Sequence, residues 1–125
     1  MILDTNAISA LADGDQGVES IVRGADELAI PSIVLGEYWF GVKQSRDRTR
    51  YEAWLLALLP DCRILAIDEE TAAAYAELRL ELKRLRRPIP SNDLWIAALT
   101  RQFAQMLVSQ DRHFDSVPKL KRLSW

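Results

Sequence analysis

The chain has 125 residues and a formal net charge of -2, and its 49% hydrophobic and 27% charged residues exclude a globally disordered chain. The length fits one domain, residues 1–125, and the small net charge neither favours nor excludes a nucleic-acid partner. Cys62 is the only cysteine, which excludes an internal disulfide and a cysteine-rich zinc site, and no apolar run has membrane-spanning length. We therefore expect a soluble, cytoplasmic, single-domain protein.

Short apolar runs alternate with helical patterns along the chain. The runs that predict strands are Ile2-Leu3, Leu28 to Ile30, Ile64 to Ile67, Met106 to Val108 and an edge strand near Leu120 to Leu123. The helical patterns are Thr5 to Ala12, Gly17 to Gly24, a helix from Ser32, about Tyr51 to Leu59, Asp68 to about Arg87 and about Asp93 to Gln105. This alternation predicts an α/β fold, a three-layer α/β/α sandwich with a mostly parallel sheet of about four or five strands.

Two carboxylates lie on predicted helices without a cation at the neighbouring positions. The residues three and four positions from Glu37 are Ile33, Val34, Phe40 and Gly41. Asp93 is likewise flanked at these spacings by apolar residues only. An unpaired carboxylate on an inward helical face costs several kcal/mol, so we expect groups elsewhere in the chain to neutralise both acids.

Two further acids, Asp4 and Asp111, follow predicted strands. The carboxyl ends of parallel strands meet at one edge of a sheet, where Glu37 and Asp93 could join them. Four carboxylates of this kind suit Mg²⁺ or Mn²⁺, with one or two ions bound. Each acid also has an ordinary interpretation: a helix cap for Asp4, a favoured helix start for Asp93, a turn residue for Asp111 and a salt bridge between helices for Glu37.

The ordered set of motifs resembles the PIN domain, and more closely the VapC-type toxins of toxin-antitoxin pairs. The resemblance covers the whole chain and rests on Leu3 to Asn6, Glu37, Pro90 to Ala98, Val108 to Phe114 and Val117 to Leu120.

This resemblance implies a metal-dependent endoribonuclease that hydrolyses RNA, is usually dimeric and is silenced by a small antitoxin. It also implies an acidic site of Asp4, Glu37, Asp93 and Asp111, with polar support from Thr5, Asn6 and Ser109. In such a site, metal lowers the pKa of a bound water and stabilises the leaving 3′ oxygen. His113 stands where the family often has an acid, so a metal role at this position does not follow; a solvated loop histidine or a proton carrier are the alternatives.

A basic stripe on the predicted long helix is a candidate RNA-binding surface. Arg79, Lys83 and Arg86 lie along one side, and none has an acid three or four residues away. A solvated face without a ligand is the alternative interpretation. A second basic cluster lies between residues 43 and 50, but acids lie within it and beside it.

Large aromatic residues occur on two consecutive predicted helices: Tyr38, Trp39, Tyr51 and Trp54. They predict either a packed seam between the helices or a groove for a partner peptide such as the antitoxin.

Two other functional classes compete with the ribonuclease. A phosphate-handling hydrolase with an aspartyl nucleophile normally has an Asp-x-Asp pair, and Asp4-Thr5-Asn6 does not contain one. A PIN-like module that binds RNA or protein without cutting is the other alternative, and an RNA-cleavage assay with metal and with chelator separates it from the enzyme.

Overall fold

A five-stranded parallel sheet lies at the centre of the fold, in a computed structural model that describes residues 1–125. The strands are β1 (Ile2–Leu3), β2 (Leu28–Pro31), β3 (Cys62–Leu65), β4 (Leu107–Val108) and β5 (Arg122–Leu123). Their order is β3-β2-β1-β4-β5, and all four pairings are parallel. The predicted α/β class is confirmed, and β1 is the central strand of the sheet.

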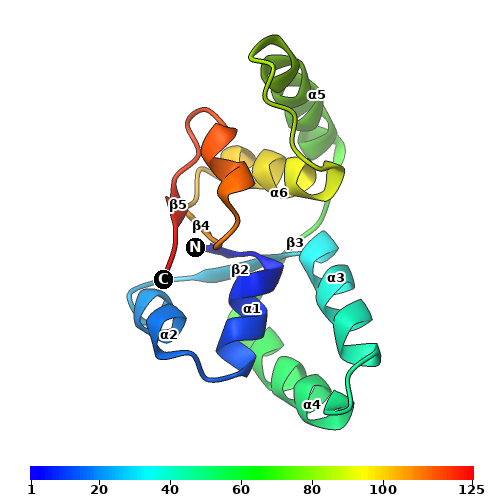
Figure 1. Ribbon diagram of the computed structural model, residues 1–125, viewed down its shortest axis with the longest axis vertical. Helices are drawn as coiled ribbons and strands as arrows, with labels where there is room; N and C mark the ends of the chain where they lie inside the picture. The colour runs from blue at the N-terminus through cyan, green and yellow to red at the C-terminus, as the bar shows by residue number, and fades with distance from the viewer.

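Six α-helices cover the sheet: α1 (Thr5–Ala12), α2 (Gln16–Arg23), α3 (Ser32–Lys43), α4 (Arg48–Leu58), α5 (Glu69–Arg84) and α6 (Ser91–Gln102). Two short 3₁₀ helices, η1 (Leu59–Asp61) and η2 (Arg112–Ser116), complete the elements. Helices α1, α2 and α4 lie on one side of the sheet, while α6 and η2 lie on the other, and α5 projects beyond α6 (Figure 1). The arrangement is the predicted three-layer sandwich, and no helix is both long and apolar enough to cross a membrane.

Local sequence explains where several helices begin. Asp4, Asp15 and Asp68 each accept a hydrogen bond from backbone N–H groups in the first turn of α1, α2 and α5. At α5 the cap is reciprocal, because the Thr71 hydroxyl also accepts a hydrogen bond from the backbone N–H of Asp68. The central strand carries the core: Ile2 and Leu3 are completely buried.

Strand β3 differs from its prediction in position and in burial. It ends at Leu65 rather than Ile67, because its pairing with β2 runs from Leu28 opposite Cys62 to Pro31 opposite Leu65. Ile64 and Ile67 are 43% and 40% exposed, so helices do not cover both faces of this apolar run, although a continuous apolar run is typical of a strand covered on both faces. The physical reason is its place at the edge of the sheet.

Helix boundaries also shift at several turns. The predicted long helix ends at Arg84, and Arg86 lies beyond it with a φ of 56°, in the left-handed region that ends many helices. Helix α4 begins at Arg48, three residues before the predicted Tyr51. The predicted loop after β4 contains η2, and the predicted edge strand is confirmed as β5.

Candidate active site

Asp4 lies at the carboxyl end of β1 and is held by donors from α1 and from the residue that follows β4. Its residue surface is only 5% exposed. The backbone N–H of Thr5 donates to Oδ1 at 2.7 Å, and the Ser109 hydroxyl, just after β4, donates to Oδ2 at 2.7 Å. The side-chain amide of Asn6 donates to Oδ2 at 3.3 Å. Asp4 is therefore both the cap of α1 and a fixed carboxylate at the sheet edge, so both interpretations of it hold.

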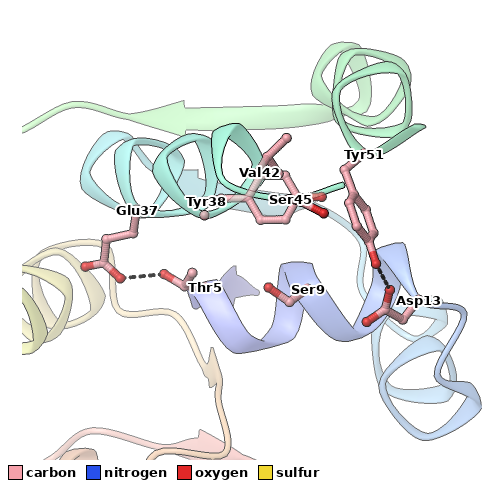
Figure 2. A pocket seen from close by; sticks show the side chains of 9 residues that line it. Thr5, Ser9, Asp13, Glu37, Tyr38, Val42, Ser45 and Tyr51 are labelled. Atoms are coloured by element: carbon pink, nitrogen blue, oxygen red, sulfur yellow. Dashed lines mark hydrogen bonds between the residues drawn. The ribbon is translucent and has the colours of Figure 1, made fainter. Parts of the chain in front are cut away.

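Glu37 reaches the same edge from the middle of α3. Its Oε2 accepts a hydrogen bond from the Thr5 hydroxyl at 2.8 Å, and its Oε1 accepts one from the Asn92 side chain at 2.9 Å. Figure 2 shows the Glu37 carboxylate directed toward Thr5. Both donors are neutral, so Glu37 is not part of a salt bridge between helices.

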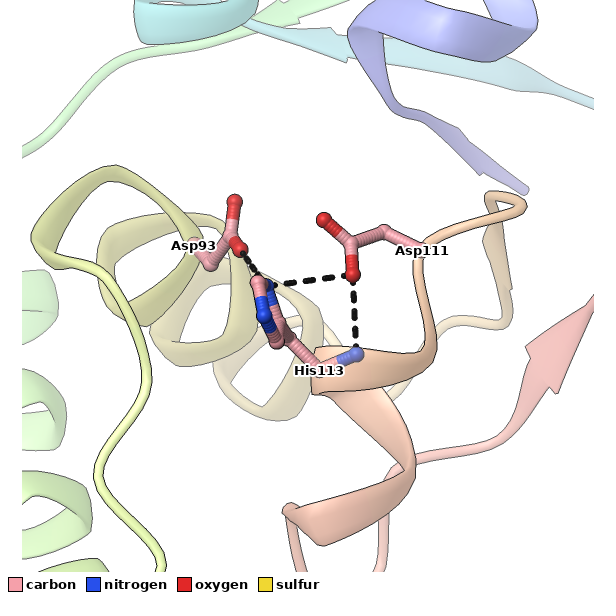
Figure 3. A group of neighbouring side chains, drawn as sticks. All are labelled: Asp93, Asp111 and His113. Atoms are coloured by element: carbon pink, nitrogen blue, oxygen red, sulfur yellow. Dashed lines mark hydrogen bonds and ion pairs between the residues drawn. The ribbon is translucent and has the colours of Figure 1, made fainter.

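Asp93 and Asp111 meet around the ring of His113 (Figure 3). The His113 Nδ1 lies 3.0 Å from Asp93 Oδ2 and 3.1 Å from Asp111 Oδ1. The backbone N–H of His113 also donates to Asp111 Oδ1 at 2.8 Å, which makes Asp111 the cap of η2. Asp93 lies in the first turn of α6. The helix-start and turn interpretations of these two acids are thus correct, and the acids still face one another.

The pKa shifts of Asp4 and Asp93 indicate that these carboxylates share one environment with the other acids. Burial raises the pKa of Asp4, the bonds from Ser109 and Thr5 oppose this rise, and the charges of Asp93 and Glu37 add to it. Burial also raises the pKa of Asp93; the His113 hydrogen bond opposes the rise, and the charges of Asp111 and Glu37 increase it. The hydrogen bond to Asp93 in turn raises the pKa of His113. Carboxylates that repel each other in this way fit a divalent cation, since oxygen ligands of this charge are those that Mg²⁺ and Mn²⁺ take.

All seven predicted site residues lie at this edge. The four acids Asp4, Glu37, Asp93 and Asp111 are accompanied by Thr5, Asn6 and Ser109, each of which bonds to at least one of the others. The structure adds Asn92, which orients Glu37, and His113, which contacts two acids. Asn92 could have been proposed from its place beside Asp93 at a helix start, but its pairing with Glu37 spans 55 positions and has no local signal.

The structure places two of the three residues of the predicted basic stripe on one face of α5. Arg79 and Lys83 line a cavity of about 420 Å³ together with Tyr75 and Ser91, and Ser91 begins the helix that carries Asp93. Arg86 lies past the end of α5 and is not on the helical face, so this part of the prediction is wrong. In the second basic cluster, Arg48 pairs with Glu52 at 2.7 Å and Arg50 with Asp47 at 3.9 Å, which neutralises half of its four cations locally.

The aromatic residues of α3 and α4 form a packed seam with a cavity beside it. The rings of Tyr38 and Trp54 lie 6.2 Å apart, and Tyr38 is buried. A cavity of about 290 Å³ runs from Thr5 and Glu37 to Asp13 and Tyr51, where the Tyr51 hydroxyl donates to Asp13 at 2.6 Å (Figure 2). The seam interpretation is confirmed for Tyr38, and this cavity reaches the acidic site.

Fold and site together define an α/β domain with a carboxylate-lined site at the carboxyl end of a parallel sheet. The chain belongs to the PIN domain family, whose model matches residues 1–120.

Individual relatives agree with this assignment. The chain is 33% identical to Ribonuclease VapC5 of Mycobacterium tuberculosis over 116 residues, which cover 90% of this chain and 84% of that protein. The solved structure of VapBC2 from Rickettsia felis, bound to a DNA fragment from its promoter, superposes with a TM-score of 0.89 at 26% identity and covers 99% of this chain and 97% of the other. The structure of VapBC-5 from Mycobacterium tuberculosis, a member of the VapBC family of toxin-antitoxin systems, superposes with a TM-score of 0.80 at 28% identity. This match covers 99% of this chain and 97% of the other.

Proposed function

We propose that this protein is a divalent metal-dependent endoribonuclease and the toxin of a toxin-antitoxin pair. The observation that carries the proposal is the convergence of Asp4, Glu37, Asp93 and Asp111, which come from four separate parts of the chain and repel one another. The relative with 33% identity is named a ribonuclease, and a cluster of carboxylates serves phosphodiester hydrolysis by holding divalent metal such as Mg²⁺ or Mn²⁺.

The protein's own residues prepare this site. Ser109 and Thr5 fix both oxygens of Asp4, while Thr5 and Asn92 fix both oxygens of Glu37. The carboxylates therefore need little reorganisation before they act as ligands or accept a proton from water. Metal bound at this edge supplies a water of lowered pKa and stabilises the leaving 3′ oxygen.

Cleavage of a labelled RNA by purified protein tests the proposal directly. Wild-type protein should cut with Mg²⁺ or Mn²⁺ and stop cutting with a chelator, and Asp93→Asn should lose at least about a hundredfold in rate. Asp26→Asn is the matched control and should cut normally, because it removes an exposed acid just before β2, at the opposite end of the strands from this site. Metal-independent cleavage, or full activity of Asp93→Asn, would overturn the proposal; RNA binding without cleavage would support the non-cutting module instead.

The cavity between α1, α3 and α4 is the proposed antitoxin contact. Glu37 lines this cavity, so a peptide bound there would contact the acidic site. Phe40 on α3 and Leu56 on α4 are 66% and 59% exposed. We propose that these two apolar side chains extend the antitoxin contact beyond the cavity. Phe40→Glu should weaken the complex with the small protein encoded beside this gene and leave RNA cleavage unchanged; an unchanged complex would remove this surface.

We also propose that the protein is a homodimer. Large apolar side chains are exposed on β3 and α5 and in the residues that directly follow these elements: Ile64, Ile67, Leu80 and Leu85. Leu80→Glu should shift a dimer to monomer in sedimentation velocity, whereas Phe40→Glu should not. A wild-type monomer at micromolar concentration would contradict the dimer.

A further inference from the structure

His113 occupies a position at the acidic site where the resemblance leads one to expect an acid. Its ring lies between Asp93 and Asp111, with Nδ1 3.0 Å from one carboxylate and 3.1 Å from the other (Figure 3). The backbone of His113 is tied to Asp111 by a hydrogen bond of 2.8 Å. The ring is therefore directed into the site by the first turn of η2, although 54% of its side-chain surface is exposed.

The spacing of these atoms is that of ligands on one metal ion. Two ligand atoms bound at about 2.1 Å in adjacent positions of an octahedron lie about 3.0 Å apart. The two distances from His113 Nδ1 match this separation, and all three ligand atoms lie within 4.8 Å of one another. A cation could thus be bound by Asp93, Asp111 and His113 with only small movements of the side chains.

An ion pair between His113 and the two acids is the competing role. In that role the ring and a metal ion would compete for the same carboxylate oxygens. A cationic ring cannot remain about 3 Å from a dication, because like charges at this distance repel strongly. When Asp93 and Asp111 hold a metal, the ring must therefore either turn away into solvent or bind the metal through Nδ1. The second outcome needs only a small movement of the ring, because Nδ1 already lies 3.0 Å and 3.1 Å from the two carboxylates.

We propose that Nδ1 of His113 is a metal ligand beside Asp93 and Asp111, which gives this chain a mixed nitrogen and oxygen site. Such a site prefers Mn²⁺ to Mg²⁺, because imidazole suits transition metals whereas Mg²⁺ selects oxygen ligands. The inference rests on the proposed metal-dependent function and specifies which residues and which ion serve it.

Pulsed electron paramagnetic resonance of the Mn²⁺-loaded protein tests the ligand directly. His113 is the only histidine, so in a tag-free full-length protein a ¹⁴N coupling typical of bound imidazole has a single source. The coupling should be present in wild type and in the control Asp26→Asn, and absent from His113→Gln and His113→Asp. Circular dichroism of each variant establishes that it is folded.

Competition titrations supply the second readout. The ratio of Mn²⁺ to Mg²⁺ affinity should fall by about tenfold in His113→Asp, because aspartate replaces an imidazole nitrogen with oxygen; tenfold is the lower end of the affinity lost when only an outer partner of a metal ligand is removed. Wild type that binds Mn²⁺ without a nitrogen coupling would overturn this inference and leave the proposed function intact. Wild type that binds Mn²⁺ no better than Asp93→Asn would overturn both.

Discussion

Replacing Ser109 with alanine should destabilise the protein far more than the loss of one hydroxyl group suggests. The Ser109 side chain is completely buried and takes part in three hydrogen bonds. It donates to Asp4 Oδ2 at 2.7 Å and accepts from the Asn6 side chain at 3.3 Å and from the backbone N–H of Asp111 at 3.0 Å. Alanine leaves the Asp4 carboxylate and the Asp111 N–H short of a partner.

The size of the effect follows from the charge on Asp4. A hydrogen bond to a charged group contributes about 1.5–3 kcal/mol, and a buried group left unsatisfied costs its desolvation in full. We expect Ser109→Ala to lower the free energy of unfolding by about 2–3 kcal/mol at pH 7, which is roughly 8–12 °C in Tm for a domain of this size. The Ser109 bond also lowers the pKa of Asp4, so the difference between variant and wild type should shrink as the pH falls and Asp4 takes up a proton.

Thermal and urea unfolding, followed by circular dichroism in chelator at several pH values, measure both effects. Ser45→Ala is the matched control, because it removes a serine hydroxyl whose bond to the backbone N–H of Asp47 is exposed. That variant should lose less than about 0.5 kcal/mol at every pH. A loss in Ser109→Ala no larger than in Ser45→Ala, or a loss that does not change with pH, would refute the charge-based reasoning.

Three further outcomes follow from the same geometry. Asp4→Asn should raise the Tm of the metal-free protein, because burial disfavours the charged form of Asp4. The same substitution should abolish stabilisation by Mn²⁺, which in wild type should be about 2.7 kcal/mol when the Mn²⁺ concentration is a hundred times Kd. In chelator, the raised pKa values of Asp4, Asp93 and His113 mean that these three groups bind more protons in the folded state than in the unfolded chain, so they should make wild-type stability fall between about pH 5 and 7. Below this range the lowered pKa values of Asp68 and Asp115 act in the opposite direction, and above it the lowered pKa of the Met1 amino group does. Thermal melts measure the fall, and stability that rises with pH in this range would contradict it. Arg79→Ala and Lys83→Ala should each weaken RNA binding and lower the salt dependence, the slope of log K against log salt, by about one, measured by fluorescence anisotropy.

The order of strands and helices could be predicted because each has a local signal. Even the two-residue strand β1 is marked by apolar Ile2 and Leu3 directly before a cap residue. Strand β3 could not be placed from its own residues, because the run Ile64 to Ile67 is equally apolar throughout. Its end is set by pairing with Pro31, the last residue of β2, and that register is a long-range property. Its exposure depends on its place at the sheet edge, which the apolar run does not reveal.

The acids of the site could be predicted for a different reason, which is that no cation lies near them in the sequence. Glu37 has no local cation, and the structure shows that its partners are two neutral donors from other elements, Thr5 and Asn92. The position of the His113 ring between Asp93 and Asp111 could not be predicted from the sequence. Its distance from Asp93 depends on how η2 packs against α6, and no spacing along the chain encodes that contact.

The pairing of β1 with β4 links the site to the fold. The backbone N–H of Asp4 donates to the carbonyl of Val108 at 3.1 Å, so the sheet ladder itself sets Asp4 beside Ser109. A shift of one residue in this pairing would turn the Asp4 side chain to the other face and separate it from Ser109. Correct folding therefore brings the carboxylates together, and their mutual repulsion lowers the stability of the folded state. A metal ion that binds only the folded arrangement offsets this repulsion and stabilises the folded state. Metal binding and folding should therefore be linked in this chain.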